Sequence, residues 1–189
     1  MEIITTDKAS RNNDMTPNQF EVAADEIAFS TGESALGLVL VARSAGGVCA
    51  ILIGSDAGEL QSDLATRFTA STLVRNDRKL AGDLRKIQRF IEAPAEGLDL
   101  PLDIRGTPFQ QRVWDVLLGI PAGRTITYAA LAARIGEPKS IRAVANACAA
   151  NAIALAIPCH RVVRSNGTLS GYRWGVERKR ALLEMEALA

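Results

Sequence analysis

The sequence predicts an α+β protein whose first half is built on an antiparallel sheet and whose second half contains a helix-turn-helix. Two observations support this fold class. In residues 26–103 the apolar, β-branched segments precede the helical ones, whereas a parallel sheet requires strands and helices to alternate. In residues 104–189 short helical segments are separated by turns that contain proline and glycine. With 189 residues, 48% of them hydrophobic, the chain can form one large domain or two small ones.

The first half begins with residues 1–25, which are polar and weakly patterned and therefore indicate a mobile leader. Three apolar segments then predict strands, with a hairpin turn at Ser44–Gly47 between the last two. Two segments of helical pattern follow and end at Pro94 and Gly97. The predicted strands lie near residues 27–30, 36–42 and 47–53, and the predicted helices near residues 57–69 and 77–92.

The second half opens with an extended linker, LDLPLDIRGTPFQ, in which Thr107 is a helix N-cap followed by proline. Thr127 is a second N-cap, and a Gly-Glu-Pro turn then separates two helices in the manner of a helix-turn-helix. The three predicted helices begin near Pro108, Tyr128 and Lys139, and the last two end near Ile135 and Ala150.

The third of these helices has two different faces when its residues are placed at steps of about 100°. The face predicted to contact the core consists of Ile141, Val144, Ala145 and Cys148. The opposite face carries Arg142, Ala143, Asn146, Ala149 and Ala150. Because most of these outward side chains are methyl groups, a partner can approach the helix backbone closely, so we interpret this face as an interface.

A buried extended segment is predicted at Ile157–Val163, and it contains Cys159 beside His160, the only histidine of the chain. Cysteine acts as a nucleophile through its thiolate, which a nearby base can generate. Adjacent side chains of a strand point apart, so a bridging water is the expected proton path between them. A last helix, Gly175–Leu188, turns Glu186 inward, where either His160 or Lys179 could be its partner.

Composition and charge narrow the function classes. Residues 1–100 carry a net charge of −5 and residues 101–189 a net charge of +6, which favours a polyanion such as nucleic acid as the partner of the second half. The first twenty residues lack the apolar region of a signal peptide, and no apolar run is long enough for a membrane span, so a cytoplasmic protein is predicted. Three cysteines and one histidine cannot form a typical zinc site, and Cys49 and Cys148 are predicted to be structural.

Several motifs together resemble the O6-alkylguanine-DNA alkyltransferases. They are Ile157-Pro-Cys-His-Arg-Val162 after a helix-turn-helix that carries Tyr128 and Arg142, together with PLDIRGTPFQQRVW and SNGTLSGYRWG. The resemblance covers about residues 26–188 and is closest to the carboxyl-terminal half of Ada-type repair proteins. It implies a ribonuclease-H-like scaffold domain at 26–103 and a winged-helix-like, helix-turn-helix catalytic domain at 104–189.

The resemblance also implies a reaction and its residues. The alkyl group of O6-alkylguanine, or of O4-alkylthymine, passes irreversibly to Cys159, so each molecule acts once. Glu186, His160 and a water generate the thiolate, and Tyr128 gives a proton to the departing base. The implied DNA-binding residues are Arg142, which fills the stack of the flipped base, Ala143, Asn146, Ala149 and Asn151, the last as a hinge before the active-site segment. The implied pocket residues are Pro158, Val162, Tyr172, Arg173 and Trp174.

Further expectations follow from the same resemblance. The partner is double-stranded DNA, bound through its minor groove by a monomer, and no cofactor or metal is needed. Trp174 stands where some relatives have glycine, so its indole is expected to narrow the pocket and favour methyl over benzyl groups.

Three alternative functions remain open. The first is a non-catalytic, damage-sensing DNA-binding protein, against which the intact Cys159 and Tyr128 argue. The second is an Ada-like transcription regulator. Residues 15–20 look like the tail of a regulatory helix-turn-helix, so a truncated relative is possible, but the alanine-rich helix face offers few groups that read bases. The third is a cysteine hydrolase, for which the chain lacks a second histidine.

Overall fold

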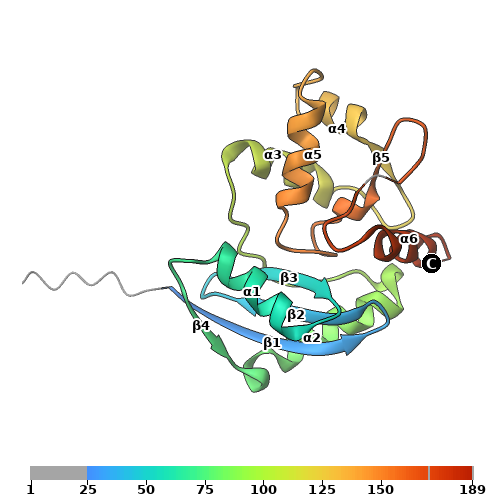
Figure 1. Cartoon of the computed structure of the whole chain (residues 1–189). Helices are drawn as coiled ribbons and strands as arrows, with labels where there is room; N and C mark the ends of the chain where they lie inside the picture. The colour runs from blue at the N-terminus through green and yellow to red at the C-terminus, as the bar shows by residue number, and fades with distance from the viewer. Residues whose placement is uncertain (1–24, 170, 189) are drawn as a thin grey trace, which may run out of the picture.

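The structure is a computed structural model that describes residues 25–169 and 171–188. The predicted leader, except for Asp25, and the segment 15–20 lie outside these residues. Figure 1 shows an α+β architecture in which a sheet with two helices forms one half and a group of helices forms the other. The C-terminal helix lies where the two halves meet.

The sheet has four strands in the order β3-β2-β1-β4. The predicted hairpin is confirmed, because β2 (Gly37–Arg43) pairs antiparallel with β3 (Val48–Gly54). The first strand, β1 (Glu26–Ser34), also pairs antiparallel with β2. The fourth strand, β4 (Thr72–Arg75), was not predicted, and it pairs parallel with β1. The sheet is therefore mixed, and the prediction of a purely antiparallel sheet is wrong at this edge.

Two helices pack on the sheet, as predicted. They are α1 (Ala57–Arg67) and α2 (Asp77–Glu92), and their N-caps are Asp56 and Asn76, whose side chains accept hydrogen bonds from backbone N–H groups. Helix α2 lies so close to β1 that a Cβ atom at Gly32 would be 2.7 Å from Leu84 Cδ2. A short 3-10 helix, η1 (Pro94–Glu96), then ends this half.

The second half contains the predicted helix-turn-helix. Thr107 begins the first helix with a capping box in which its hydroxyl accepts from Gln110 N and its N–H donates to the Gln110 side chain. Thr127 caps the next helix by accepting from Ala130 N at 3.1 Å. The elements are α3 (Pro108–Leu118), β5 (Ile126–Thr127), α4 (Tyr128–Arg134), α5 (Ile141–Ala150), η2 (Cys159–Arg161), β6 (Val162–Val163) and α6 (Val176–Ala187).

Helix α5 differs from its prediction at its first turn. It begins at Ile141 rather than near residue 139, and Ile141 is 43% exposed. The core side is formed instead by Val144, Ala147 and Cys148, while Ala145 is only half-buried. The assignment of Ile141 to the core face is therefore wrong, because this residue of the first turn is exposed and lines an open cavity instead.

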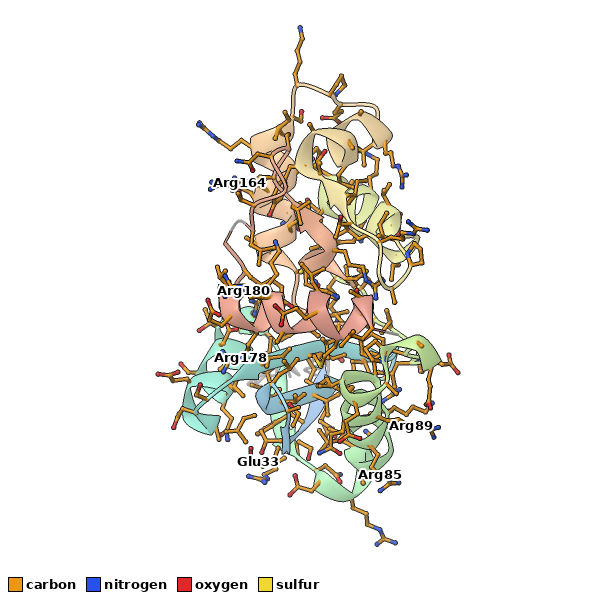
Figure 2. All side chains as sticks on the ribbon, turned by 90° about the vertical axis from the view of Figure 1, so that its right-hand side faces the viewer. Glu33, Arg85, Arg89, Arg164, Arg178 and Arg180 are labelled. Atoms are coloured by element: carbon orange, nitrogen blue, oxygen red, sulfur yellow. The ribbon has the colours of Figure 1, made fainter. Side chains whose placement is uncertain are left out.

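The two halves are joined at the free edge of β3. Ile51 N donates to Ala152 O and Ala154 N donates to Ile51 O, each at 2.9 Å, so the segment that follows α5 pairs with the sheet. Helix α6 adds a second connection, because Arg178 donates to Leu36 O at 2.7 Å and to Ser55 Oγ at 2.9 Å. Figure 2 shows α6 crossing the molecule between the sheet and the helices, with Arg178 on the side of the sheet.

Candidate active site

Cys159 lies on a turn rather than on the predicted extended segment. Cys159 to Arg161 form the 3-10 helix η2, and only Val162–Val163 are extended. The prediction of burial is confirmed, since Cys159 is 4% exposed. The turn places the sulfur within 3.2 Å of Asn151 Nδ2, which donates a hydrogen bond to it.

Asn151 connects the end of α5 to this turn. The side chain is fully buried and forms three hydrogen bonds: Nδ2 donates to Ile157 O at 2.9 Å and to Cys159 Sγ, and Oδ1 accepts from Ile153 N at 2.8 Å. The residue is also the C-cap of α5. The orientation of the helix-turn-helix and the position of the sulfur are therefore fixed by one amide group.

His160 and Glu186 form a buried pair. His160 Nε2 is 2.8 Å from Glu186 Oε1, and both side chains are inaccessible to solvent. The alternative partner, Lys179, points elsewhere and donates to Val162 O at 2.6 Å. Sequence reasoning missed Arg161, which donates from Nε and Nη2 to the Glu186 carboxylate at 2.7–3.1 Å and from Nη1 to Ile120 O. Its position two residues after the cysteine, inside a segment predicted to be buried, was the feature of the sequence that could have indicated a buried ion pair.

The pair defines which atom of His160 can act as a base. Burial alone would raise the pKa of Glu186, but hydrogen bonds from His160 and Arg161 and their charges lower it to about 2. An ionised carboxylate only accepts, so Nε2 carries the proton and Nδ1 has the free lone pair. His160 Nδ1 is buried and has no hydrogen-bond partner among the described residues. Burial also lowers the pKa of His160, so the ring is neutral at pH 7.

The thiol of Cys159 is protonated in this environment. Burial raises its pKa to about 11, although the hydrogen bond from Asn151 and the charge of Lys179 act in the opposite direction. No hydrogen bond joins Cys159 Sγ to His160 among the residues that the structure describes. Formation of a thiolate at neutral pH therefore requires the removal of a proton by a base.

Cys159 lies at a cavity of about 270 Å³ between α4, α5 and the loop before α6. The cavity is lined by Tyr128, Ala145, Cys148, Ala149, Cys159, Gly171, Tyr172 and Arg173. Cys148 thus has a cavity surface in addition to its place in the core. Tyr172 closes one side, and its hydroxyl is buried without a partner among the described residues.

Three predicted pocket residues lie outside the lining of this cavity. Pro158 and Val162 are buried. Trp174 packs edge-on against Tyr172, with ring centroids 5.1 Å apart, and lines a neighbouring cavity against α1. The indole therefore supports the wall formed by Tyr172, whereas the sequence predicted direct narrowing of the pocket.

The predicted interface face of α5 is exposed beside this cavity. Arg142, Ala143, Asn146 and Ala149 are all exposed, and Ala150 is half-buried. A second, more open cavity of about 530 Å³ adjoins the first and is lined by Tyr128, Ile141, Arg142, Ala145, Arg164 and Gly171. Arg164 was not predicted, and Figure 2 shows it in the helical half, beyond Arg180 of α6.

Two other kinds of feature are missing from residues 25–169 and 171–188. No group of three or more His, Cys, Asp or Glu side chains is arranged to hold a metal ion there. In the same residues no helix is both long and apolar enough to cross a membrane.

Comparisons with known proteins agree with this geometry. Residues 108–188 match the family described as 6-O-methylguanine DNA methyltransferase, DNA binding domain. The chain is 48% identical over 182 residues to the bifunctional transcriptional activator/DNA repair enzyme Ada of Escherichia coli, covering 95% of this chain and 51% of that protein. It is 41% identical over 123 residues to the inducible methylated-DNA–protein-cysteine methyltransferase of Bacillus subtilis, covering 65% of this chain and 69% of the relative.

Solved structures show that the fold is similar to that of known methyltransferases. The crystal structure of Mycobacterium tuberculosis OGT in complex with DNA has a TM-score of 0.69 and 33% identity, covering 86% of this chain and 93% of that one. The crystal structure of Mycobacterium tuberculosis O6-methylguanine methyltransferase has a TM-score of 0.66 and 34% identity, with 86% and 93% coverage. The chain spans about half the length of the Ada proteins that it matches. It nevertheless covers more than two thirds of the Bacillus relative and nearly all of the two Mycobacterium structures, and it belongs to the methylated-DNA–protein-cysteine methyltransferase family.

Proposed function

We propose that this protein repairs DNA by transferring the alkyl group of O6-alkylguanine to the sulfur of Cys159. The observation that carries the proposal is the position of Cys159 at a cavity, next to a buried His160–Glu186 pair whose Nδ1 is available as a base. Relatives with 37–46% identity are named methylated-DNA–protein-cysteine methyltransferases. O4-alkylthymine is a second substrate in this proposal.

The proposed transfer is an in-line displacement at the alkyl carbon. The thiol proton of Cys159 passes through a bridging water to His160 Nδ1, and Glu186 stabilises the imidazolium that results. The sulfur–carbon bond then forms as the carbon–O6 bond breaks, and Tyr128, which lines the cavity, gives a proton to the departing base. A thioether is a poor leaving group, so the product cannot be turned over and each molecule acts once.

DNA binding is proposed to use the exposed face of α5 in the minor groove. The damaged base must leave the stack to reach the cavity, at a cost of a few kcal/mol. Arg142 fills the space that the base leaves, while Ala143 and Ala149 allow close approach and Asn146 contacts the groove. Asn151 is the hinge that keeps this helix in register with Cys159. The protein acts on duplex DNA as a monomer and in the cytoplasm in this proposal.

The flipped base is proposed to be read by backbone groups near Pro158 and Val162 on one side and Tyr172–Arg173 on the other. Trp174 supports Tyr172 from behind, so it limits how far this wall can move outward. Methyl groups are therefore expected to react faster than benzyl groups. Equal rates with O6-methylguanine and O6-benzylguanine in the same duplex would overturn this expectation.

A finer description of the architecture belongs to the same proposal. Residues 26–103 form a ribonuclease-H-like scaffold, and residues 104–189 form a winged-helix-like catalytic and DNA-binding domain. Residues 1–25 are a leader. The family membership and the mixed α+β fold support this division.

The test is the intact mass of the protein after incubation with a duplex that contains one O6-methylguanine. We expect a single added methyl group on Cys159, in an amount no greater than the protein present. Cys159→Ala should show no gain, and Cys49→Ala, which removes a buried thiol of β3, should react like the wild type. Tight binding to the lesion without a change in mass would reject the transfer and favour a damage-sensing protein.

A further inference from the structure

Arg164 is an exposed arginine at the open cavity beside the Cys159 site, and the proposed alkyl transfer does not use it. It follows directly on β6, in the helical half of the molecule (Figure 2). Within the part of the chain that the structure describes, its guanidinium group forms no ion pair and no hydrogen bond. The charge of this side chain is therefore available to a partner from outside the protein.

The pairing of β5 with β6 places Arg164 next to Tyr128. The two strands are parallel, and Thr127 lies opposite Val163. Tyr128 and Arg164 are the next residues of the two segments, so both leave the small sheet at the same end. Both also line the open cavity of about 530 Å³, together with Arg142 of α5. Two arginines from different elements and the proposed proton donor thus surround one opening.

A tight turn fixes the backbone of Arg164. Its N–H donates to Thr168 O at 3.1 Å, and Gly167 N donates to Arg164 O at 2.9 Å. Inside the turn, Asn166 Oδ1 accepts from Thr168 N at 3.1 Å, and Gly167 has a φ of +76°, which glycine adopts without strain. Because the backbone is already ordered, little conformational entropy is lost when the side chain binds a ligand.

The chemistry of this opening fits a phosphate group. Arginine binds phosphate through two parallel N–H groups. Among the described residues that line the cavity there is no carboxylate, so no negative side chain repels an anion there. A nucleotide whose base has entered the smaller cavity leaves its two flanking phosphates at the mouth. Arg142 is proposed to fill the stack, so Arg164 is the arginine left for a phosphate.

We propose that Arg164 binds one of the two phosphates that flank the flipped nucleotide and thereby holds the damaged base at Cys159. The inference rests on the proposed function, because it needs a flipped nucleotide. Arg164 is a positioning residue, since it contacts the DNA backbone and neither the base nor the alkyl group. The contact is complete only after the base has left the stack, so it favours the flipped state over the stacked one.

The test combines a substitution in the protein with one in the DNA. Arg164→Gln removes the cation, and a methylphosphonate on either side of O6-methylguanine removes the charge of one phosphate. Affinities are measured by fluorescence anisotropy in the Cys159→Ala background, where no methyl group is transferred. We expect Arg164→Gln to weaken binding about tenfold. The slope of log K against log salt should become shallower by about 0.9, which corresponds to one phosphate contact.

The two substitutions should also depend on each other. One of the two methylphosphonates should weaken binding by the protein with Arg164 and have almost no further effect on Arg164→Gln. Arg78→Gln removes an exposed arginine of α2, in the other half of the molecule, and is the matched control that should bind like its parent.

Two results would overturn the proposal. The first is that both methylphosphonates weaken Arg164→Gln as much as they weaken its parent. The second is slower methyl transfer by Arg164→Gln at saturating DNA with an unchanged salt slope, which would assign the side chain to the base. Because binding is measured without transfer, a wild-type protein that leaves the methyl group on DNA would refute the proposed function and not the phosphate contact.

Discussion

At the scale of single residues, a few buried polar groups hold the sulfur of Cys159 in place and influence its pKa. Asn151, His160 and Glu186 are each fully or almost fully buried, and each is tied to others by hydrogen bonds. A buried polar group that loses its partner costs more than a hydrogen bond normally contributes, so these positions combine stability with reactivity.

Asn151→Ala tests this combination. The substitution leaves Ile157 O, Ile153 N and Cys159 Sγ without their side-chain partner, and we expect a loss of about 2 kcal/mol or more in the free energy of unfolding. The pKa of Cys159 should also rise, because the hydrogen bond that lowers it is removed. Urea unfolding and the pH dependence of iodoacetamide alkylation measure the two effects. Asn146→Ala, an exposed amide on the same helix, should change stability by less than about 0.5 kcal/mol.

At the scale of elements, α5 packs one side against the core and leaves the other side exposed as the proposed DNA-binding face. Val144, Ala147 and Cys148 pack inward, while the outward face consists mainly of alanine. The same helix ends at Asn151, whose side chain donates a hydrogen bond to Cys159 Sγ, so a helix that binds DNA as proposed would also set the position of this sulfur.

Ala143→Glu should weaken binding to duplex DNA at least about tenfold. A carboxylate in the middle of the interface repels the phosphates and keeps the helix from approaching the groove. Ala65→Glu places the same charge on an exposed alanine of α1, in the other half of the molecule, and should leave the affinity almost unchanged. Fluorescence anisotropy with a labelled duplex at fixed salt compares the two, and equal affinities would exclude α5 from the interface.

Local signals explain which elements could be predicted from the sequence. The N-caps Thr107 and Thr127 fix helix starts through hydrogen bonds within three residues, so both were found. The strand Thr72–Arg75 has four residues, largely exposed, and its pairing with β1 depends on chain segments far apart. No apolar pattern marks such a strand.

The candidate site was predictable to a similar extent. The inward orientation of Glu186 followed from helical spacing. Whether its partner is His160 or Lys179 could be decided only from the three-dimensional structure. The 3-10 turn at Cys159 could not be distinguished from a strand, because both give a continuous buried segment. The turn is held by Asn151 Nδ2, a tertiary contact that leaves no periodic pattern in the sequence.

At the scale of the whole molecule, stability is coupled to the charge state of the site. Hydrogen bonds from His160 and Arg161 outweigh burial and hold the pKa of Glu186 at about 2, compared with 4.5 for a free side chain. The unfolded chain therefore binds more protons than the folded one between these pH values, and folding loses stability as the pH falls through this range.

Glu186→Gln should remove this part of the acid sensitivity. At pH 7 the variant is expected to be less stable than the wild type by about 3 kcal/mol or more, because the charge of Arg161 loses its partner. Between pH 5 and pH 3 that difference should shrink by about 2 kcal/mol, because protonation of Glu186 in the unfolded chain destabilises the folded wild type relative to it. Urea unfolding at each pH gives these values. Glu184→Gln, which faces solvent on the same helix, should follow the wild type. A difference that does not change with pH would mean that folding does not lower the pKa of Glu186.

The junction between the halves predicts how the molecule unfolds. Buried residues of the sheet, including Ile51, belong to the same hydrophobic cluster as Trp114 and Ile153 of the helical half, and backbone hydrogen bonds of β3 cross the junction. Both tryptophans are in the second half, whereas the four-stranded sheet is in the first. Urea transitions followed by tryptophan fluorescence and by far-ultraviolet circular dichroism should therefore coincide.

Two substitutions at the junction separate apolar packing from ion pairing. Ile153→Ala should lower the free energy of unfolding by about 2–5 kcal/mol as measured by both probes, because it leaves a cavity in the shared core. Asp63→Asn removes the carboxylate that binds Arg173 at the surface and should cost less than about 1 kcal/mol. If Ile153→Ala instead shifted only the fluorescence transition, the sheet would unfold independently of the helical half. If both shift, the sheet half stabilises the Cys159 site directly, because the segment that pairs with β3 at Ile153 is the one that leads from Asn151 to the nucleophile.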